Sequence, residues 1–555
     1  MTADSTGMKA VATVDATTLR AWLTDGEEVA LVDVRDGGPF SRSHLLVACN
    51  IPLAQLELKA PELLPRRDSR IVLIDDAPAE GQNSAQRAAA LLSQHGYRRL
   101  SILEGGTSGW GACGFELFSG TNVPSKAFGE HVEHTCETPR IDPDVLHQWQ
   151  QEGRDIVLVD SRPAEEFRTV SLPGASNCPG AELVLRVPGL VRSDKTIVVV
   201  NCAGRTRSII GTQSLRNAGL PNPVYALKNG TMGWELAGFK ADHGREDLVP
   251  VPQGAALAQA RQMADDVAKR YGVSFIDRNA MRSMQAESHR TTHVFDVRQP
   301  AEFAAGHMPG SLNAPGGQLV QATDTFVVTR GARIVLVDSL QVQSVMTAHW
   351  LLQMGWHDVH VLTDGLSAED GLGADGQPGL LETGPVRTKG LGEAVLPDQT
   401  LSPQTLHAQL KDDAVTVIDV GDSFRWRRGH VPGSCYAMRS HLPQVLERFS
   451  LQRPLVFVCT DGRLSRFAAQ DARALGYAAV STLAGGRSAW LAAGLPTETC
   501  STDDDPKLLT PTDDMWYPPY ARTSAVQEAM QQYLTWEVNL LEQLAREPYL
   551  TFSAP

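Results

Sequence analysis

The stretch VLVDSRPAEEF at residues 157–167 is a short apolar run that ends in Asp160 and is followed by a turn. The same pattern occurs three more times in the chain, as ALVDVRDGGPF at 30–40, HVFDVRQPAEF at 293–303 and TVIDVGDSFRW at 416–426. The copies lie about one small domain apart, a spacing too long for a solenoid repeat. We therefore predict four tandem domains of one fold.

Each copy continues with further elements in the same order. A Pro-Gly turn follows in three copies, as SLPGASN at 171–177, HMPGSLN at 307–313 and HVPGSCY at 430–436, and HLLVACN at 44–50 stands there in the first. A second β run, a helical pattern and a third β run come next. Three copies close with a Gly-Trp element, GGTSGW at 105–110, NGTMGW at 229–234 and GGRSAW at 485–490, whereas the third has DGLSAED at 364–370. Strands alternating with helices predict a parallel sheet covered on both faces.

These repeats predict an α/β protein with four tandem domains, each a parallel sheet flanked by helices, and a C-terminal helical extension. The predicted domains are 1–125, 126–250, 251–388 and 389–500, and the extension is 501–555. Linkers are expected near 121–138, near 241–272 with an added helical stretch at 254–272, and near 371–398. An apolar stripe in the helical pattern at 524–546 indicates packing on the domains or on a second subunit, which leaves a homodimer open.

Composition limits the possible functions. A formal net charge of −14 argues against a nucleic-acid partner, because phosphate binding needs clustered cations. Eight cysteines without CxxC spacing argue against a disulfide framework and a structural zinc site. No segment is typical of a signal peptide or a membrane span. We expect a cytoplasmic protein with no cofactor, no metal and no membrane partner.

Two of the four second strands end on a cysteine. The chain has VVVNCAGRTRS at 198–208 and CTDGRLSR at 459–466, so Cys202 and Cys459 stand where a helix is about to begin. Ligands of open α/β sheets bind at the carboxyl ends of strands. A helix N-terminus and nearby arginines lower the pKa of a thiol and hold an anion. Each cysteine is thus predicted to be a thiolate in an anion-binding loop.

The ordered elements, namely the DxR after the first strand, the PGS or PGA turn, the strand-end cysteine and the Gly-Trp element, resemble those of the rhodanese-like sulfurtransferases over nearly all of residues 10–500. The tandem of four domains is similar to bacterial multidomain thiosulfate sulfurtransferases. The resemblance implies that a thiolate attacks the outer sulfur of thiosulfate or a similar donor and that sulfite leaves. The sulfur then stays as a cysteine persulfide until a thiol or cyanide removes it.

The resemblance implies roles for individual residues. Cys202 and Cys459 are the expected nucleophiles, and Gly204 and Gly462 are expected to let the backbone turn tightly around the sulfur. Arg205 and Arg207 are expected to bind the donor. The full set of expected substrate-binding residues is Gly204, Arg205, Thr206, Arg207, Ser208, Gly462, Arg463 and Arg466. The partners are a small-molecule donor and acceptor, and a protein acceptor stays open.

The first and third copies depart from the pattern. Asp75 and Asp76 stand at the strand end of the first, and Asp338 and Ser339 at that of the third. A carboxylate repels an anionic donor, and none of these side chains can hold sulfane sulfur. We predict that these two domains are inactive.

The DxR element also differs between copies. The pairs Asp33–Arg35, Asp160–Arg162 and Asp296–Arg298 are expected to be structural ion pairs. In the fourth copy Gly421 replaces the arginine, and Asp461 lies beside Cys459. We expect Cys459 to react but to prefer a less charged donor than Cys202, and its turnover of thiosulfate stays open.

Two alternative functions remain. A cysteine-dependent phosphatase or arsenate reductase needs an arginine six positions after the cysteine, where this chain has Ser208 and Ser465, so this alternative is the weaker one. The other is a scaffold or sulfur-relay binding protein, which the two domains without a strand-end cysteine would suit.

Overall fold

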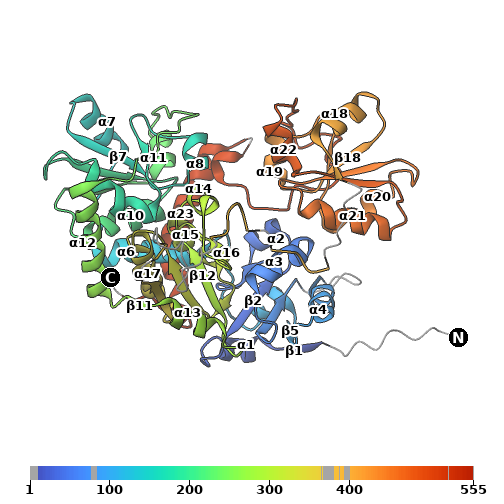
Figure 1. Ribbon diagram of the computed structural model, residues 1–555, viewed down its shortest axis with the longest axis horizontal. Coiled ribbons are helices and arrows are strands. Elements are labelled where there is room, and N and C mark those ends of the chain that lie inside the picture. Colours follow the sequence, from blue (N-terminus) through green and yellow to red (C-terminus); the bar gives the residue numbers. More distant parts are fainter. Residues whose placement is uncertain are drawn as a thin grey trace. The chain divides into compact units, whose positions relative to one another are not determined.

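The computed structural model describes residues 11–76, 84–363, 365–366, 381–386, 388–392, 400–522 and 524–553. Four α/β domains follow one another along the chain, and a helix follows the fourth (Figure 1). The predicted fold class is therefore confirmed. The segment DGLSAED and the linker expected near 371–398 lie largely outside the described residues, as does the N-terminal stretch 1–10.

Each of the first two domains alternates strands and helices. The first contains β1 (Ala12–Val14), α1 (Ala16–Trp22), β2 (Val29–Asp33), α2 (Gly37–Arg42), β3 (Cys49–Asn50), η1 (Leu53–Gln55), α3 (Leu56–Leu63), β4 (Arg70–Ile74), α4 (Ser84–Gln94), β5 (Arg99–Leu103) and α5 (Gly106–Ala112). Helix α6 (Val123–Cys136) precedes the second domain. That domain contains β6 (Arg140–Ile141), α7 (Pro143–Gln151), β7 (Ile156–Asp160), α8 (Ala164–Thr169), β8 (Ser176–Asn177), η2 (Gly180–Glu182), α9 (Leu183–Arg186), η3 (Val187–Gly189), β9 (Ile197–Asn201), α10 (Thr206–Asn217), β10 (Val224–Leu227) and α11 (Gly230–Leu236).

The other two domains repeat this succession. Helix α12 (Gly254–Tyr271) leads into the third, which contains β11 (Ser274–Ile276), α13 (Arg278–Gln285), β12 (Thr292–Asp296), α14 (Pro300–Ala305), β13 (Leu312–Asn313), α15 (Gly316–Gln321), α16 (Thr323–Phe326), β14 (Thr329–Arg330), β15 (Arg333–Val337), α17 (Gln343–Gln353) and β16 (Val359–Leu362). The fourth contains β17 (Thr400–Leu401), α18 (Pro403–Lys411), β18 (Thr416–Asp419), α19 (Ser423–Arg428), β19 (Cys435–Tyr436), η6 (Arg439–His441), α20 (Leu442–Leu446), β20 (Leu455–Val458), α21 (Leu464–Ala474), β21 (Val480–Leu483) and α22 (Gly486–Ala492). The extension contains η7 (Pro519–Ala521) and α23 (Val526–Leu544), which confirms its helical pattern.

The strands that each domain contributes to its sheet have the same order in all four domains. It is β6-β10-β9-β7-β8 in the second domain, β11-β16-β15-β12-β13 in the third and β17-β21-β20-β18-β19 in the fourth, and the first domain places β1-β5-β4-β2-β3 in the same way. Neighbouring strands of the second domain run parallel. The middle strands β4, β9, β15 and β20 are apolar almost throughout, because helices cover both faces. The last residues of each of these four strands lie at the carboxyl edge of its sheet.

The Gly-Trp element anchors a short helix against that edge. Trp110, Trp234 and Trp490 are fully buried, and each indole Nε1 donates a hydrogen bond to the carbonyl six residues later, at 2.9, 2.9 and 2.7 Å. The glycine is needed because the helix start approaches the strand end closely. A Cβ on Gly230, whose φ is +56°, would stand 2.3 Å from the carbonyl oxygen of Cys202.

The domains associate in two compact units. The fourth domain and the first domain without residues 20–29 form one unit, called here the 1–4 unit. The second and third domains form the other with α6, α12 and α23, called here the 2–3 unit. Each unit therefore joins a domain with a strand-end cysteine to a domain with an aspartate at that place. In the 2–3 unit one hydrophobic core runs through both domains and includes Leu183, Leu319 and Trp350.

Residues 121–138, where a linker is expected, connect the first two domains and include helix α6, which packs into this core. Helix α6 carries Phe128 and Val132, which are fully buried. The Phe128 ring contacts the Trp350 ring with their centroids 5.7 Å apart. The helical stretch expected at 254–272 is confirmed as α12, which ends on Gly272 in the left-handed region. Within the described residues no helix combines the length and the apolar character needed to cross a membrane.

Candidate active site

Cys202 follows β9 directly and lies in the loop that leads into α10. Its side chain is buried, with 2% of the residue exposed, and its Sγ lies 3.5 Å from the hydroxyl of Ser208. The start of α11 closes the loop from the other side, because the main-chain N–H of Thr231 donates to the carbonyl of Cys202 at 2.8 Å. The fold therefore places the thiol at the carboxyl edge of the sheet, as predicted.

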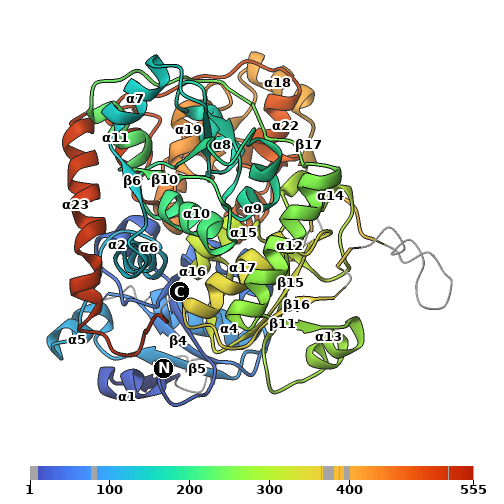
Figure 2. The same ribbon diagram turned by 90° about the vertical axis from the view of Figure 1, so that its left-hand side faces the viewer.

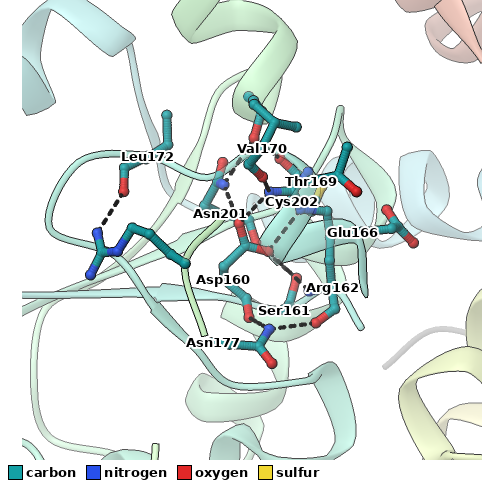
Figure 3. A network of polar contacts seen from close by, with 12 residues as sticks. Asp160, Ser161, Arg162, Glu166, Thr169, Val170, Leu172, Asn177, Asn201 and Cys202 are labelled. Atoms are coloured by element: carbon teal, nitrogen blue, oxygen red, sulfur yellow. Dashed lines mark hydrogen bonds and ion pairs between the residues drawn. The ribbon is translucent and has the colours of Figure 1, made fainter. Parts of the chain in front are cut away.

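A buried polar network supports the strand that carries Cys202 (Figure 3). Arg162 donates to both carboxylate oxygens of Asp160, at 2.9 and 2.7 Å, and to the carbonyl of Val170 at 2.6 Å. Asn201, the residue before Cys202, donates to Asp160 at 2.8 Å. Arg162 and Asp160 are 1% and 0% exposed, so this pair is structural, as expected, and holds β7 and β9 together below the thiol.

The two arginines of the loop are both paired with glutamates. Arg205 donates to Glu130 at 2.6 and 2.7 Å and to Glu133 at 2.5 Å, so it faces α6. It also lines a cavity of about 820 Å³ between α6 and α23. Arg207 donates to the carboxylate of Glu166 at 2.7 and 2.8 Å. That both arginines bind the donor stays a prediction, and the geometry favours Arg207, whose ion pair is the more exposed of the two.

Helices α6 and α23 cover the Cys202 loop, and neither belongs to the repeated α/β pattern. A Cβ on Gly129 of α6 would stand 2.7 Å from the side chain of Thr206. The Thr206 hydroxyl donates a hydrogen bond to the carboxylate of Glu537 in α23, and a Cβ on Gly204 would stand 3.5 Å from the same carboxylate. Figure 2 shows α23 running beside α6. The loop is thus enclosed by residues far away in the sequence.

The covering helices bring further charge. Glu537 is 1% exposed, and its Oε2 has no hydrogen-bond partner among the described residues. The ammonium group of Lys126 lies 5.4 and 5.0 Å from the ring centroids of Tyr533 and Trp536. Burial lowers the pKa of Lys126 to about 8, although the charge of Glu537 opposes that shift. No local pattern in the sequence points to these residues, because their helices lie outside the repeats.

Several predicted site residues are buried in supporting positions. Ser208 is fully buried, and its hydroxyl donates to the carbonyl of Arg205 at 2.8 Å. Gly462 has the expected left-handed backbone, with a φ of +84°. Gly204 does not adopt a positive φ and is needed for space, because a Cβ there would stand 2.9 Å from Met232. The left-handed backbone supports a tight turn at Gly462 and not at Gly204, and the role of both glycines around the sulfur stays a prediction.

The expectation of a lowered thiol pKa is wrong for this enclosed form of the site. Burial raises the pKa of Cys202, and the charge of Glu537 adds to this, while Arg207 and Ser208 act in the opposite direction. Burial likewise raises the pKa of Cys459 to about 11. The helix N-terminus and the arginines do not outweigh desolvation, because Arg205 and Arg207 are already neutralised by carboxylates.

Cys459 occupies the same place in the fourth domain. Its Sγ accepts a hydrogen bond from the main-chain N–H of Ser465 at 3.3 Å and lies 3.8 Å from the carboxylate of Asp461. Arg463 donates to the carbonyl of Thr388 at 2.7 Å. The predicted binding residue Arg466 is exposed. The two cysteine loops therefore differ in charge, as expected from Asp461.

Aspartates occupy the equivalent place in the other two domains. The carboxylate of Asp338 accepts hydrogen bonds from the main-chain N–H groups of Gln341 at 2.8 Å and Gln343 at 2.9 Å, and from the Ser344 hydroxyl at 2.9 Å. In the first domain Asp75 begins a loop whose residues 77–83 lie outside the described part of the chain. No group of three or more potential metal-ligand side chains occurs within the described ranges.

Comparisons with known proteins agree with this geometry. The crystal structure of a thiosulfate sulfurtransferase from Pseudomonas aeruginosa is 43% identical, with a TM-score of 0.87, over 98% of this chain and 100% of that one. An HTH-type transcriptional regulator of Mycobacterium tuberculosis is 36% identical over 97 residues, which are 17% of this chain and 41% of that relative. The family model described as Rhodanese-like domain matches residues 15–113, 142–237, 279–368 and 402–493. The chain therefore belongs to the rhodanese-like domain family and carries four copies of that domain.

Proposed function

We propose that this chain is a thiosulfate sulfurtransferase of the rhodanese type, which forms a persulfide on Cys202. It takes sulfane sulfur from thiosulfate or a similar small donor and passes it to a thiol or cyanide. The likeness to the sulfurtransferase of Pseudomonas aeruginosa over nearly the whole chain supports this activity. A protein acceptor and a homodimer remain proposals of lower rank.

One observation carries the proposal. The loop of the third domain holds the carboxylate of Asp338 with two main-chain N–H groups and the hydroxyl of Ser344. Ser208 and Ser465 stand at the same distance along the chain from Cys202 and Cys459 as Ser344 does from Asp338. A loop of this type offers main-chain N–H groups and a hydroxyl to a negative charge at its centre, which oppose the effect of burial, and in the second domain we propose that they act on the thiolate and then on the persulfide.

The proposed reaction balances without a cofactor. The Cys202 thiolate attacks the outer sulfur of thiosulfate, a sulfur–sulfur bond forms, and the bond to the inner sulfur breaks. Sulfite leaves with that electron pair, and Cys202 keeps a persulfide with one negative charge. An acceptor thiolate or cyanide then attacks the outer sulfur of the persulfide and regenerates the Cys202 thiolate.

The surrounding residues have different proposed roles. Arg207 exchanges its partner Glu166 for the donor, since this ion pair lies at the partly exposed side of the loop. Arg205, Thr206 and Ser208 hold the loop in shape through their buried hydrogen bonds. We propose that the first and third domains are inactive and stabilise the two domains with cysteines. Free cysteines suit the reducing cytoplasm, which is the proposed location.

Mass spectrometry after incubation with thiosulfate tests the proposal. The Cys202 peptide should gain the mass of one sulfur atom and lose it when cyanide is added. Cys202→Ser should abolish most of the thiosulfate:cyanide activity, whereas Cys136→Ser, which changes a half-buried cysteine of α6, should retain it. Full activity in Cys202→Ser would overturn the assignment. If neither Cys202 nor Cys459 gains sulfur in the folded protein, a scaffold function replaces the enzymatic one.

A further inference from the structure

Arg487 stands at a position that the four domains share. In each domain, the main-chain N–H of one residue at the start of the Gly-Trp element or its equivalent donates to the carbonyl of the strand-end residue. These residues are Thr107, Thr231, Leu366 and Arg487, with distances of 3.1, 2.8, 3.0 and 2.8 Å. Only the fourth domain has a charged side chain there. The exchange is visible in the sequence, where GGRSAW replaces GGTSGW and NGTMGW.

The start of α22 lies directly on the Cys459 loop. A Cβ on Gly486 would stand 2.2 Å from the carbonyl oxygen of Cys459 and 2.9 Å from the main-chain nitrogen of Asp461. Arg487 follows this glycine and is only 6% exposed. Its guanidinium group has no hydrogen bond or ion pair within the described part of the chain. None of its nitrogen atoms is among the fully enclosed atoms without a partner, so solvent and an anionic ligand can reach the guanidinium group.

The nearby carboxylate of Asp419 also lacks the partner that the equivalent aspartates have. In the other three domains the aspartate that ends β2, β7 or β12 is paired with the arginine two residues later. Asp419 has Gly421 at that place and accepts only its main-chain N–H, at 2.8 Å, on Oδ1. Its Oδ2 is buried and has no hydrogen-bond partner among the described residues. The charge of Arg487 in α22 acts on Asp419 and lowers its pKa, although burial raises it more. In this domain the cation that acts on the aspartate therefore comes from the last helix, whereas in the other three domains it is the arginine two residues after the aspartate.

Other arginines around this loop already have partners. Arg463 donates to Thr388 and lies 3.5 Å from Glu62. Arg439 is paired with Glu57 and Asp471. Arg487 therefore keeps donors for a ligand beside Cys459, because its guanidinium group has no partner among the described residues, and Asp461 near the thiol disfavours a ligand with two negative charges.

We propose that Arg487 is the anion-binding residue of the Cys459 site and that it selects a sulfane-sulfur donor with a single negative charge, such as one that carries a carboxylate group or one whose leaving group is a sulfinate. This inference rests on the proposed function for the identity of the donor. The binding of an anion beside Cys459 is a separate property and can be measured without sulfur transfer.

Two alkylating reagents of different charge test, in the full chain, whether Arg487 binds an anion beside Cys459. Iodoacetate carries a carboxylate and iodoacetamide is neutral, so the ratio of their rate constants at Cys459 reports a cation beside the thiol. Peptide mapping separates Cys459 from Cys202, which serves as the internal reference. Arg487→Thr, which installs the residue of the first two domains, should lower the ratio at Cys459 about tenfold and leave that at Cys202 unchanged. Arg487→Lys should keep most of the ratio.

A double variant separates anion binding from a structural role. Gly421→Arg in the Arg487→Thr background restores the arginine of the other domains next to Asp419, although the carboxylate must adjust because a Cβ at 421 would stand 2.9 Å from its Oδ1. We expect this second change to restore any free energy of unfolding that Arg487→Thr loses, while the ratio of the iodoacetate to the iodoacetamide rate constant at Cys459 stays low. An unchanged ratio in Arg487→Thr overturns the inference, and so does a Cys459 that neither reagent modifies in the native protein. Neither outcome affects the persulfide test at Cys202.

Discussion

The carboxylate of Glu537, in the last helix of the chain, accepts a hydrogen bond from the hydroxyl of Thr206, four residues after Cys202. The two residues are 331 positions apart in the sequence. Glu537 is buried, and its Oε2 near Gly204 has no hydrogen-bond partner among the described residues, so the C-terminal extension contributes an acidic side chain to the surroundings of the thiol. The extension thus influences the chemistry as well as the packing.

Glu537→Gln should make Cys202 more reactive at neutral pH. Removing the charge lowers the pKa of the Cys202 thiol, so we expect iodoacetamide to modify it about threefold to tenfold faster at pH 7. The apparent pKa from rates measured across pH should fall in parallel. Glu542→Gln, which changes an exposed glutamate of the same helix, is the control and should have no effect. A slower or unchanged reaction in Glu537→Gln would show that the charge does not reach the thiol.

Arg207 and Glu166 should affect the Michaelis constant for thiosulfate in opposite directions. Arg207→Ala removes a charge-assisted contact and should raise KM about tenfold. Glu166→Gln releases the guanidinium from its 2.7 Å ion pair and should lower KM. Steady-state kinetics with thiosulfate and cyanide measure both effects, and Glu165→Gln in the same helix is the matched control. Equal KM values in all the variants would place the donor elsewhere.

Arg205→Ala should destabilise the 2–3 unit. The change leaves Glu130, which is fully buried, without its ion pair, at a cost of about 3–5 kcal/mol in the free energy of unfolding. Denaturant titration measures the loss. Adding Glu130→Gln to Arg205→Ala should recover part of it, because no unpaired charge is then buried. A wild-type free energy of unfolding in Arg205→Ala would contradict the structural role of this pair.

Local motifs made the repeated fold predictable. The DxR element and the Gly-Trp element each fix contacts between residues close in the sequence, such as Arg162 with Asp160 and Trp234 with the carbonyl six residues on. The strand-end position of Cys202 follows from the same local patterns. The conformation of such motifs depends on residues close in the sequence, so four domains and two cysteine loops could be predicted without a structure.

The charges around the thiol were not predictable in the same way. Glu130 and Glu537 meet the Cys202 loop across 75 and 331 residues, and no local pattern connects them. Glu130 pairs with Arg205, and the pKa of Cys202 is raised mainly by burial, with a smaller contribution from the charge of Glu537, so the loop arginines do not lower it as expected. In contrast, the unusual position of Arg487 is visible in the sequence, because the first two repeats have a threonine at the aligned position.

The unpaired Asp419 should make the stability of the 1–4 unit fall as pH rises from about 4 to about 7. Burial raises the pKa of Asp419 from 3.8 in the unfolded chain to about 7 in the folded one. Between these values the folded state binds more protons than the unfolded state, so stability is highest at the acidic end of the window and is lost as Asp419 ionises. Asp419→Asn should remove this part of the pH dependence, which denaturant titrations at pH 5, 6 and 7 would show as a difference between wild type and variant. Asp296→Asn in the third domain, whose aspartate is paired with Arg298, is the contrasting variant and should not flatten the profile. The same slope in wild type and Asp419→Asn would mean that Arg487 already keeps this carboxylate ionised in the folded protein, with a pKa near that of the unfolded chain.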